Sequence, residues 1–180
     1  IPNSIDWEEF TRIPTEQLFR EKYGISKDYI LFNGRIVEHK GVHILLEAIK
    51  KIQSELDLKL IIIGKGEGNY LKKIQKFIRD NGLKNKVLII DPLDREMQMS
   101  AYNGAKIFVL PSFQEGLPTV LLEAMAMGKV CIASKTAGCD IINDRINGYS
   151  FSTGNSSELS KLIVEVNEAD PQVLNKIKLN

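Results

Sequence analysis

The sequence predicts an α/β domain with a mostly parallel sheet of about six strands and helices on both faces, a three-layer arrangement. Short apolar runs of strand length alternate with segments of helical periodicity, and the connections between them are short. Several runs are apolar throughout, which is typical of parallel strands because helices cover both of their faces. The chain has 180 residues, 43% of them apolar, and is long enough for one well-packed domain.

The first half of the chain predicts three helices and two strands. Gly24 and Gly82 each follow a helical pattern, as glycine does after the last turn of a helix. The run from Tyr29 to Asn33 is apolar until its last residue and predicts a buried strand that ends at Gly34. The expected elements are a helix over 14–23, a strand over 29–33, a helix over 42–56, a strand over 58–63 and a helix over 70–81.

The second half continues the alternation. Asp94 can cap the helix that follows it, and Ser156 or Ser157 can cap the last helix. The tail over 171–180 is polar and weakly patterned, so no element is expected there. The expected elements are a strand over 87–90, a helix over 94–102, a strand over 106–110, a helix over 118–127, a strand over 129–133, a short helix over 139–143, a strand over 148–151 and a helix from 156 or 157 to about 167.

Charge and cysteine content exclude several classes of function. The net charge of +1 gives no electrostatic reason to expect binding to nucleic acid or to an anionic membrane surface. Cys131 and Cys139 lie in or beside apolar segments without metal or redox spacing, so both are interpreted as buried residues in a reducing compartment. No segment approaches the roughly 20 apolar residues of a membrane span. The chain starts at Ile1 rather than methionine, which suggests a fragment of a longer protein.

The stretch from Pro111 to Gly128 predicts a helix that begins at Pro118 and is packed on nearly every side, because it is almost wholly apolar. Glu123 is its one charged residue, so either a partner binds this carboxylate or it reaches solvent through a gap in the packing. Glu115 lies in the preceding loop. The helix N-terminus offers unpaired N–H groups and a positive dipole to a phosphate or a polyhydroxyl ligand. The residues that carry these N–H groups are Gly116, Leu117, Thr119 and Val120.

Right-handed crossovers bring the strand-to-helix loops of a parallel sheet to one edge. The loops after Asn33, Ile63, Ile90 and Leu110 are therefore expected to line one crevice, where ligands of such sheets bind. The first of these loops carries Arg35, with a forked guanidinium, and Lys40, with a point charge. Together they could clamp a diphosphate; the alternative is a basic loop that only faces solvent.

Other site types fit the sequence poorly. No Walker loop is present, and a dinucleotide fingerprint fails at Asn69, where it needs a third glycine. His39 and His43 are spaced as in helical metal pairs, but His39 is expected to precede the helix and no third ligand is apparent. Ser112 has no obvious base and lies in no Gly-x-Ser-x-Gly motif. The sequence thus predicts no metal site, no nicotinamide or flavin site and no nucleophilic serine.

Five spaced motifs resemble the nucleotide-sugar-binding, Rossmann-like half of GT-B glycosyltransferases, above all the retaining family numbered four, glycosyl transferases group 1. The resemblance covers about residues 3–152 and implies the C-terminal half of a two-domain enzyme. On that basis residues 1–13 are an interdomain linker remnant, 14–170 the nucleotide-sugar-binding domain and 171–180 a polar tail. The motifs are Gly34-Arg35, Lys40-Gly41, Gly64-x-Gly66, Pro111-Ser112 and Glu115-x7-Glu123 with Ala124-Met125-Ala126 and Gly128.

The resemblance also implies roles for these residues. Arg35 and Lys40 would hold the diphosphate of a UDP-sugar or GDP-sugar donor, Glu115 would contact the donor sugar, and Glu123 would accept from the ribose hydroxyls. Arg35, Lys40 and Glu115 are the expected catalytic residues, with no metal and no prosthetic group. The remaining binding residues would be Gly34, Gly64, Gly66, Gly116, Leu117, Pro118, Thr119 and Val120.

This sequence departs from the family pattern at four places. Leu117-Pro118 stands where many members have Phe-Gly, and Asp91-Pro92 replaces a usual glycine, which puts the base-binding loop in doubt. Asp140 stands where a glutamate is common. The final helices that cross back onto the N-terminal domain in the family are expected to be short or missing.

The expected function is transfer of a sugar from a nucleotide diphosphate sugar to an acceptor with retention of configuration. Acceptor binding would come from an N-terminal domain of the same protein, so this chain alone would bind donor without catalysis. The expected location is the cytoplasm, with any contact to the cytoplasmic membrane face made through the missing part. A nucleotide-sugar epimerase, a phosphorylase of GT-B architecture and a non-catalytic nucleotide-sugar-binding module are the alternatives.

Overall fold

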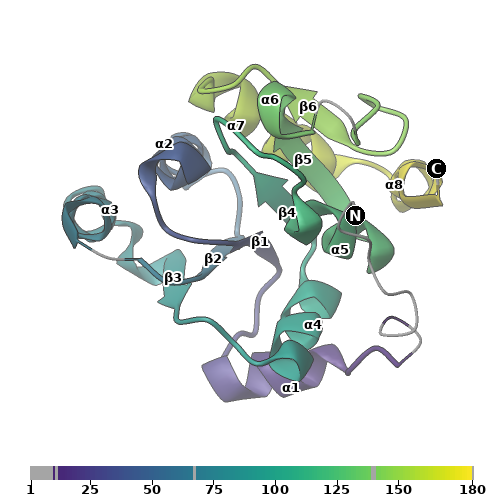
Figure 1. The fold of residues 1–180 in the computed structure, drawn as a ribbon, viewed down its shortest axis with the longest axis horizontal. Coiled ribbons are helices and arrows are strands. Elements are labelled where there is room, and N and C mark those ends of the chain that lie inside the picture. Colours follow the sequence, from purple (N-terminus) through teal and green to yellow (C-terminus); the bar gives the residue numbers. More distant parts are fainter. Residues whose placement is uncertain (1–9, 11, 67, 139–140, 180) are drawn as a thin grey trace.

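The computed structural model describes residues 10, 12–66, 68–138 and 141–179. It contains one six-stranded sheet in the order β3-β2-β1-β4-β5-β6, and every recorded strand pair is parallel. The expected α/β architecture is therefore confirmed (Figure 1). The strands are β1 (Tyr29–Asn33), β2 (Lys59–Ile63), β3 (Val87–Ile90), β4 (Ile107–Leu110), β5 (Val130–Ser134) and β6 (Tyr149–Phe151).

The helices follow the strands in regular alternation, and most bounds agree with the sequence pattern within two or three residues. Helix α2 ends four residues before the expected position, and α6 and α8 differ more from the expectation. The helices are α1 (Glu16–Tyr23), α2 (Val42–Ile52), α3 (Gly68–Asp80), α4 (Arg95–Gly104), α5 (Thr119–Ala126), α6 (Lys135–Gly138), α7 (Ser156–Glu168) and α8 (Pro171–Leu179), with short 3-10 helices η2 (Glu38–Lys40) and η3 (Leu83–Asn85).

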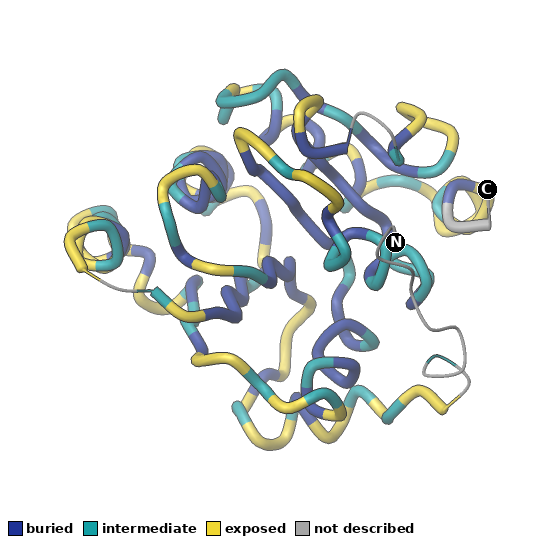
Figure 2. The backbone as a smooth tube through the Cα atoms, in the orientation of Figure 1, coloured by how far each residue is buried: buried dark blue, intermediate teal, exposed yellow. Residues whose placement is uncertain are grey.

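Two apolar cores lie on opposite faces of the sheet. Ile30 and Phe32 of β1 belong to the core formed with α2, α3 and α7, whereas Tyr29 and Leu31 belong to the core formed with α1, α4 and α5. Figure 1 shows these two groups of helices on either side of the sheet, and the strands between them are almost wholly buried in Figure 2. Successive strand residues point to opposite faces, so a continuous apolar run fills both cores.

The order of the strands places a switch point between β1 and β4. The chain builds outward from β1 through β2 to β3, and then returns to add β4, β5 and β6 on the other side of β1. The β1–α2 and β4–α5 loops therefore lead to opposite faces of the sheet, and in sheets of this order ligands bind in the crevice outside the carboxyl ends of two such strands.

Side-chain caps start several of the helices, and one of the two caps expected from the sequence was wrong. Asp94 accepts from the N–H of Met97 at 2.9 Å and starts α4, as predicted. Asn155, rather than either of the two serines that follow it, caps α7 by accepting from the N–H of Glu158 at 3.1 Å. A cap oxygen accepts from an N–H two or three residues ahead, and Asn155 stands directly before the first helical residue, where its side chain can do so.

The short helix expected over 139–143 was also wrong in position. Helix α6 forms earlier because Ser134, the last residue of β5, accepts from the N–H of Ala137 and so caps it. Residues 141–143 are not helical, and Cys139 and Asp140 lie outside the described residues. Apolar periodicity does not reveal this helix start, because the capping residue is also the last residue of a strand.

The tail forms helix α8, which the sequence analysis did not expect. Asp170 accepts from the N–H of Gln172 at 2.7 Å, and Pro171 occupies the first helical position. Ile177 is buried in the core that includes α2 and α7. Asp170 followed by Pro171 is a sequence typical of the start of a helix, but the tail was judged by its polar composition instead.

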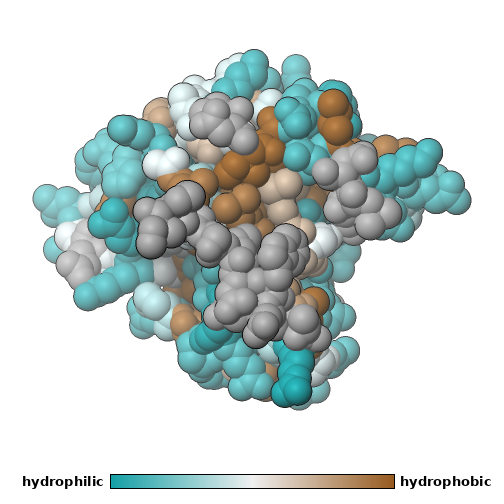
Figure 3. Space-filling model, turned by 45° about the vertical axis from the view of Figure 1, so that its right-hand side comes forward, coloured by the Kyte–Doolittle hydropathy of each residue, from teal (hydrophilic) through white to brown (hydrophobic). Residues whose placement is uncertain are grey.

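Helix α5 is covered less completely than its apolar sequence predicted. Of its residues only Leu121 and Ala124 are buried, while Leu122 and Met125 are half-buried. Pro118 precedes the helix as its N-cap residue instead of beginning it. Figure 3 shows an apolar area on an otherwise largely hydrophilic face of the molecule. No described helix is long and apolar enough to span a membrane.

Cys131 is wholly buried in β5, as predicted, and this burial raises the pKa of its thiol. A raised pKa keeps the sulfur protonated at neutral pH, and the thiol reacts far more slowly than its thiolate. We expect site-resolved mass spectrometry to find Cys131 unlabelled by iodoacetamide at pH 8 in the folded chain and labelled after addition of 6 M guanidinium. Rapid labelling under native conditions would contradict this prediction.

Candidate functional site

Glycines bring the loops after β1 and β2 into direct contact. The N–H of Gly34 donates to the carbonyl of Ile63 at 2.9 Å, and that of Ile36 donates to Lys65 at 2.9 Å, so the two strands stay paired beyond their ends. A Cβ on Gly64 would lie 1.9 Å from the carbonyl oxygen of Gly34. Gly66 forms a bridge with Ile36. These glycines thus have a packing role, while their predicted approach to a nucleotide stays a prediction.

Gly41 joins the β1–α2 loop to the β4–α5 loop. It has φ 67° and ends η2, and a Cβ at this position would lie 2.1 Å from the carbonyl oxygen of Pro111. The N–H of Phe113 donates to the carbonyl of His39 at 2.8 Å, which ties the same two loops together. The two loops therefore cross at backbone contact distance, and this crossing places Lys40 beside Glu115.

Lys40 and Glu115 form a nearly buried ion pair. The Nζ atom of Lys40 lies 2.7 Å from each carboxylate oxygen of Glu115, and the two side chains are 17% and 9% exposed. From the family resemblance, Lys40 was expected to bind a diphosphate and Glu115 a sugar, whereas in the structure the two residues bind each other. An ammonium group has three donors, so Lys40 keeps one for a ligand.

Arg35 is exposed in the loop that also carries Lys40. Within the described part of the chain, its guanidinium forms no hydrogen bond or ion pair. The next residue, Ile36, is fully buried and paired with the β2–α3 loop, so the backbone that carries Arg35 is held firmly. Its forked donors are therefore available to a ligand at the crevice.

Glu123 has two protein partners that the sequence analysis did not identify. Arg95 donates from Nη1 to Oε1 at 2.7 Å, and the hydroxyl of Tyr102 lies 3.2 Å from Oε2. The carboxylate side chain is 17% exposed, so it has partners and also reaches the surface. Both expectations for Glu123 therefore hold in part, because protein side chains bind the carboxylate and some of it still reaches solvent.

Tyr102 extends this network into the core. Its hydroxyl accepts from Nδ2 of buried Asn33 at 3.0 Å. Burial, with the negative charge of Glu123 as a second cause, raises the pKa of Tyr102 well above its usual value, so the hydroxyl remains a donor. Asn33 was visible in the sequence as the one polar residue at the end of an apolar strand, which is a signal for a buried hydrogen bond.

The N-terminus of α5 faces the same crevice with unpaired donors. Thr119 donates its N–H to the carbonyl of Leu117 at 3.0 Å. The N–H groups of Gly116 and Leu117 donate to no other described residue, and both residues are exposed. Backbone hydrogen bonds join the loops after β1, β2 and β4. Arg95 follows the loop after β3 and bonds to Glu123 in α5. The prediction that these four loops lie close together is therefore correct.

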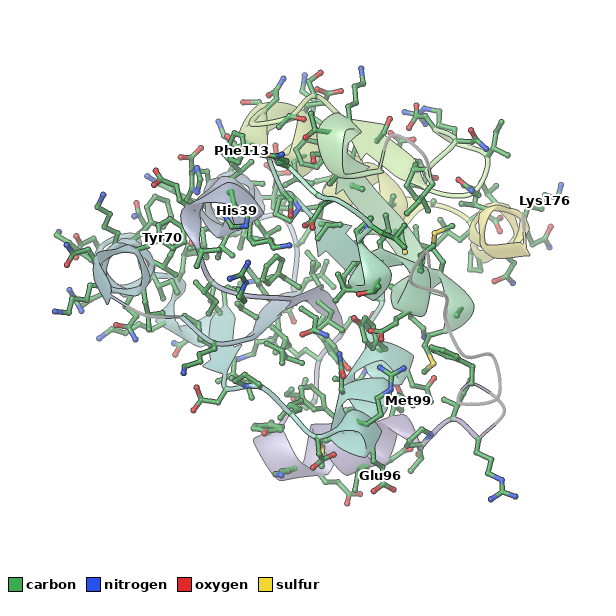
Figure 4. All side chains as sticks on the ribbon, in the orientation of Figure 1. His39, Tyr70, Glu96, Met99, Phe113 and Lys176 are labelled. Carbon is green, nitrogen blue, oxygen red and sulfur yellow. The ribbon has the colours of Figure 1, made fainter. Side chains whose placement is uncertain are left out.

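An aromatic group supports the β4–α5 loop from outside the crevice. The rings of Phe113 and His43 are stacked, with centroids 5.7 Å apart, and Nδ1 of His43 lies 2.8 Å from the hydroxyl of Tyr70. Figure 4 shows Phe113, His39 and Tyr70 on the same side of the molecule, near α2 and α3. His43 thus has a structural role, and His39 precedes α2 as expected.

Comparison with known families decides the class of protein. The model of the family "Glycosyl transferases group 1" matches residues 15–178. The chain belongs to this family. This result confirms the resemblance to glycosyl transferases group 1, and the six-stranded parallel sheet agrees with the GT-B fold that the resemblance implied.

Individual group 1 relatives are similar over most of the chain. The lipopolysaccharide 1,2-N-acetylglucosaminetransferase of Salmonella typhimurium is 30% identical over 94% of this chain and 46% of its own length. The crystal structure of the C-terminal domain of LpcC from Francisella tularensis is 27% identical, covering 98% of this chain and 94% of that chain with a TM-score of 0.83. Anabaena HepE in complex with UDP-glucose is 26% identical over 99% of this chain and 50% of that chain, with a TM-score of 0.86. The chain spans less than half the length of the curated relatives it matches.

Proposed function

We propose that this group 1 domain binds the nucleoside diphosphate sugar donor of a glycosyltransferase that retains the configuration of the transferred sugar. The observation that carries the proposal is the charge arrangement at the α5 N-terminus. Two carboxylates, Glu115 and Glu123, are each held by a cation, and the unpaired guanidinium of Arg35 stands in a neighbouring loop. Cations suit a diphosphate, and carboxylates suit the hydroxyls of a sugar and a ribose.

The same arrangement suits the chemistry of transfer. A sugar that leaves a nucleoside diphosphate passes through an oxocarbenium-like state while negative charge grows on the diphosphate. Arg35, Lys40 and the unpaired N–H groups of Gly116 and Leu117 would stabilise that charge. Glu115 would accept hydrogen bonds from the sugar hydroxyls while Lys40 holds its carboxylate in place.

The relatives support a nucleotide-sugar donor. HepE was crystallised with UDP-glucose, and the Salmonella relative transfers N-acetylglucosamine. We propose a UDP-sugar or a GDP-sugar as the donor here, with the acceptor bound by an N-terminal domain of the same protein. An epimerase, a phosphorylase or a non-catalytic module would share the donor site, and assays on a two-domain protein would separate these alternatives.

Calorimetry tests the donor site in this chain. We expect one of UDP, GDP and ADP, or a sugar conjugate of one, to bind saturably. Arg35→Ala should weaken that binding by about 10-fold to 100-fold, because this is the effect on affinity of losing one charge-assisted hydrogen bond. Thermal unfolding should not change, because Arg35 has no partner among the described residues.

Lys84→Ala is the matched control for this experiment. Lys84 is an exposed cation in η3, which precedes β3, so it lies at the opposite edge of the sheet from the crevice. Its loss changes the net charge equally and should leave nucleotide affinity unchanged. A folded chain that binds none of the three nucleotides or their sugar conjugates would contradict the proposed donor site.

A further inference from the structure

Arg95 connects the carboxylate of Glu123 with an aromatic ring near the start of the chain. Its Nη1 atom lies 2.7 Å from Oε1 of Glu123, and its guanidinium carbon lies 5.6 Å from the ring centroid of Phe10. The Arg95 side chain is 38% exposed, whereas that of Glu123 is 17% exposed. The guanidinium is therefore held by a charge and by a ring face, an arrangement that restricts its rotamers.

The hydrogen bonds from Arg95 and Tyr102 orient the Glu123 carboxylate but leave some of its acceptor sites free. Arg95 donates to one oxygen, and Tyr102 lies within hydrogen-bond distance of the other. A carboxylate has about four acceptor sites, so each oxygen keeps capacity for one more donor. Two adjacent hydroxyls, such as those of a ribose, need an acceptor with one free site on each oxygen.

Arg95 also offsets a charge that would oppose the ligand. A diphosphate is anionic, and an unpaired carboxylate close to it would repel it. The phenol of Tyr102 is uncharged at neutral pH, so it holds the Glu123 carboxylate in place but cannot balance its charge. Arg95 supplies both the orientation and the compensating charge.

We propose that Arg95 is a positioning residue that fixes the Glu123 carboxylate for the two ribose hydroxyls of a nucleoside diphosphate. The ring of Phe10 also supports the guanidinium. Arg95 acts through Glu123 and makes no contact of its own with the ribose. This inference rests on the proposed function, because it assigns the nucleotide to the same crevice.

Deletion of the ribose hydroxyls gives a direct test. Calorimetry on the chain would compare UDP and GDP with their 2′,3′-dideoxy analogues, for the unchanged protein and for Arg95→Gln. We expect Arg95→Gln to weaken binding of the ribonucleotide about tenfold, the scale of one lost charge-assisted hydrogen bond. The dideoxy analogue should lose less than about threefold, because it keeps only the repulsion between its diphosphate and the uncompensated Glu123 charge and no longer uses Glu123 as an acceptor. Arg95→Lys, which keeps the charge, should recover part of the ribonucleotide affinity.

Arg145→Gln is the matched control. Arg145 also pairs with a glutamate, Glu165, at 3.0 Å, and both side chains lie on the surface in the second half of the chain. This variant should bind both forms of the nucleotide as the unchanged protein does. If Arg95→Gln does not fold, Phe10→Leu removes the ring and leaves the pair with Glu123 intact. Phe10→Leu should then produce a smaller loss with the same selectivity for the ribonucleotide.

The outcomes separate this inference from the proposed function. Equal losses with the ribonucleotide and the dideoxy analogue would overturn the inference, since Arg95 would then act on the phosphates or the base. Unchanged affinity in Arg95→Gln would also overturn it. In both cases an effect of Arg35→Ala would leave the proposed function standing. A folded, unchanged chain that binds none of UDP, GDP and ADP or their sugar conjugates would overturn the two together.

Discussion

Gly41→Ala is expected to destabilise the fold by about 3 kcal/mol and to disrupt the candidate site. Gly41 has φ 67°, which costs an L-residue about 1 kcal/mol. The new Cβ would lie 2.1 Å from the carbonyl oxygen of Pro111, and this contact with backbone adds about 2 kcal/mol because neither loop can yield without breaking its pairing. Urea-induced unfolding would measure the change in free energy.

Gly82→Ala provides the control for Gly41→Ala. Gly82 has φ 69°, almost the same backbone conformation, but a Cβ there would meet nothing within 4 Å. This variant should lose only about 1 kcal/mol. Equal losses in the two variants would show that the crossing of the β1–α2 and β4–α5 loops contributes nothing beyond the backbone conformation.

Lys40→Met is expected to weaken binding of the cognate nucleoside diphosphate about 100-fold. The variant removes a cation from the diphosphate and also leaves the Glu115 carboxylate, 9% exposed, without its counter-charge in the same crevice. Both effects oppose an anionic ligand. Calorimetry with UDP and GDP would measure the loss, with circular dichroism to verify that the variant is folded.

Glu115→Gln separates the two roles of this ion pair. It removes the negative charge, so affinity for the free diphosphate should stay the same or rise, whereas the added affinity from the donor sugar should fall. The double variant Lys40→Met/Glu115→Gln should recover part of the diphosphate affinity that Lys40→Met loses. Unchanged affinity for UDP and GDP in Lys40→Met would remove Lys40 from the diphosphate site.

Apolar periodicity predicted most of the helices and strands, but it failed where a polar capping residue sets the start of a helix. The continuous apolar run from Tyr29 to Asn33 fills both cores, so its strand was predictable to the residue. Helix α6 was misplaced because its cap, Ser134, is also the end of a buried strand. Helix α8 was missed because polar residues separate its apolar ones, although Leu174 packs against the core and Ile177 is buried in it.

The sequence by itself determined the parallel sheet and the loops that meet at its edge, because periodicity and glycine positions are local properties of the chain. It also identified Arg35, Lys40, Glu115 and Glu123 as the charged residues at that edge. Only the tertiary structure decided which charged side chains form ion pairs with one another.

Lys40 pairs with Glu115 across 75 residues, and Arg95 pairs with Glu123 across 28. Such contacts depend on strand order and on the close crossing of loops at Gly41 and Gly64, where backbone approaches backbone. Spacing along the chain does not encode these distances, because they are set by how the sheet brings separate segments together.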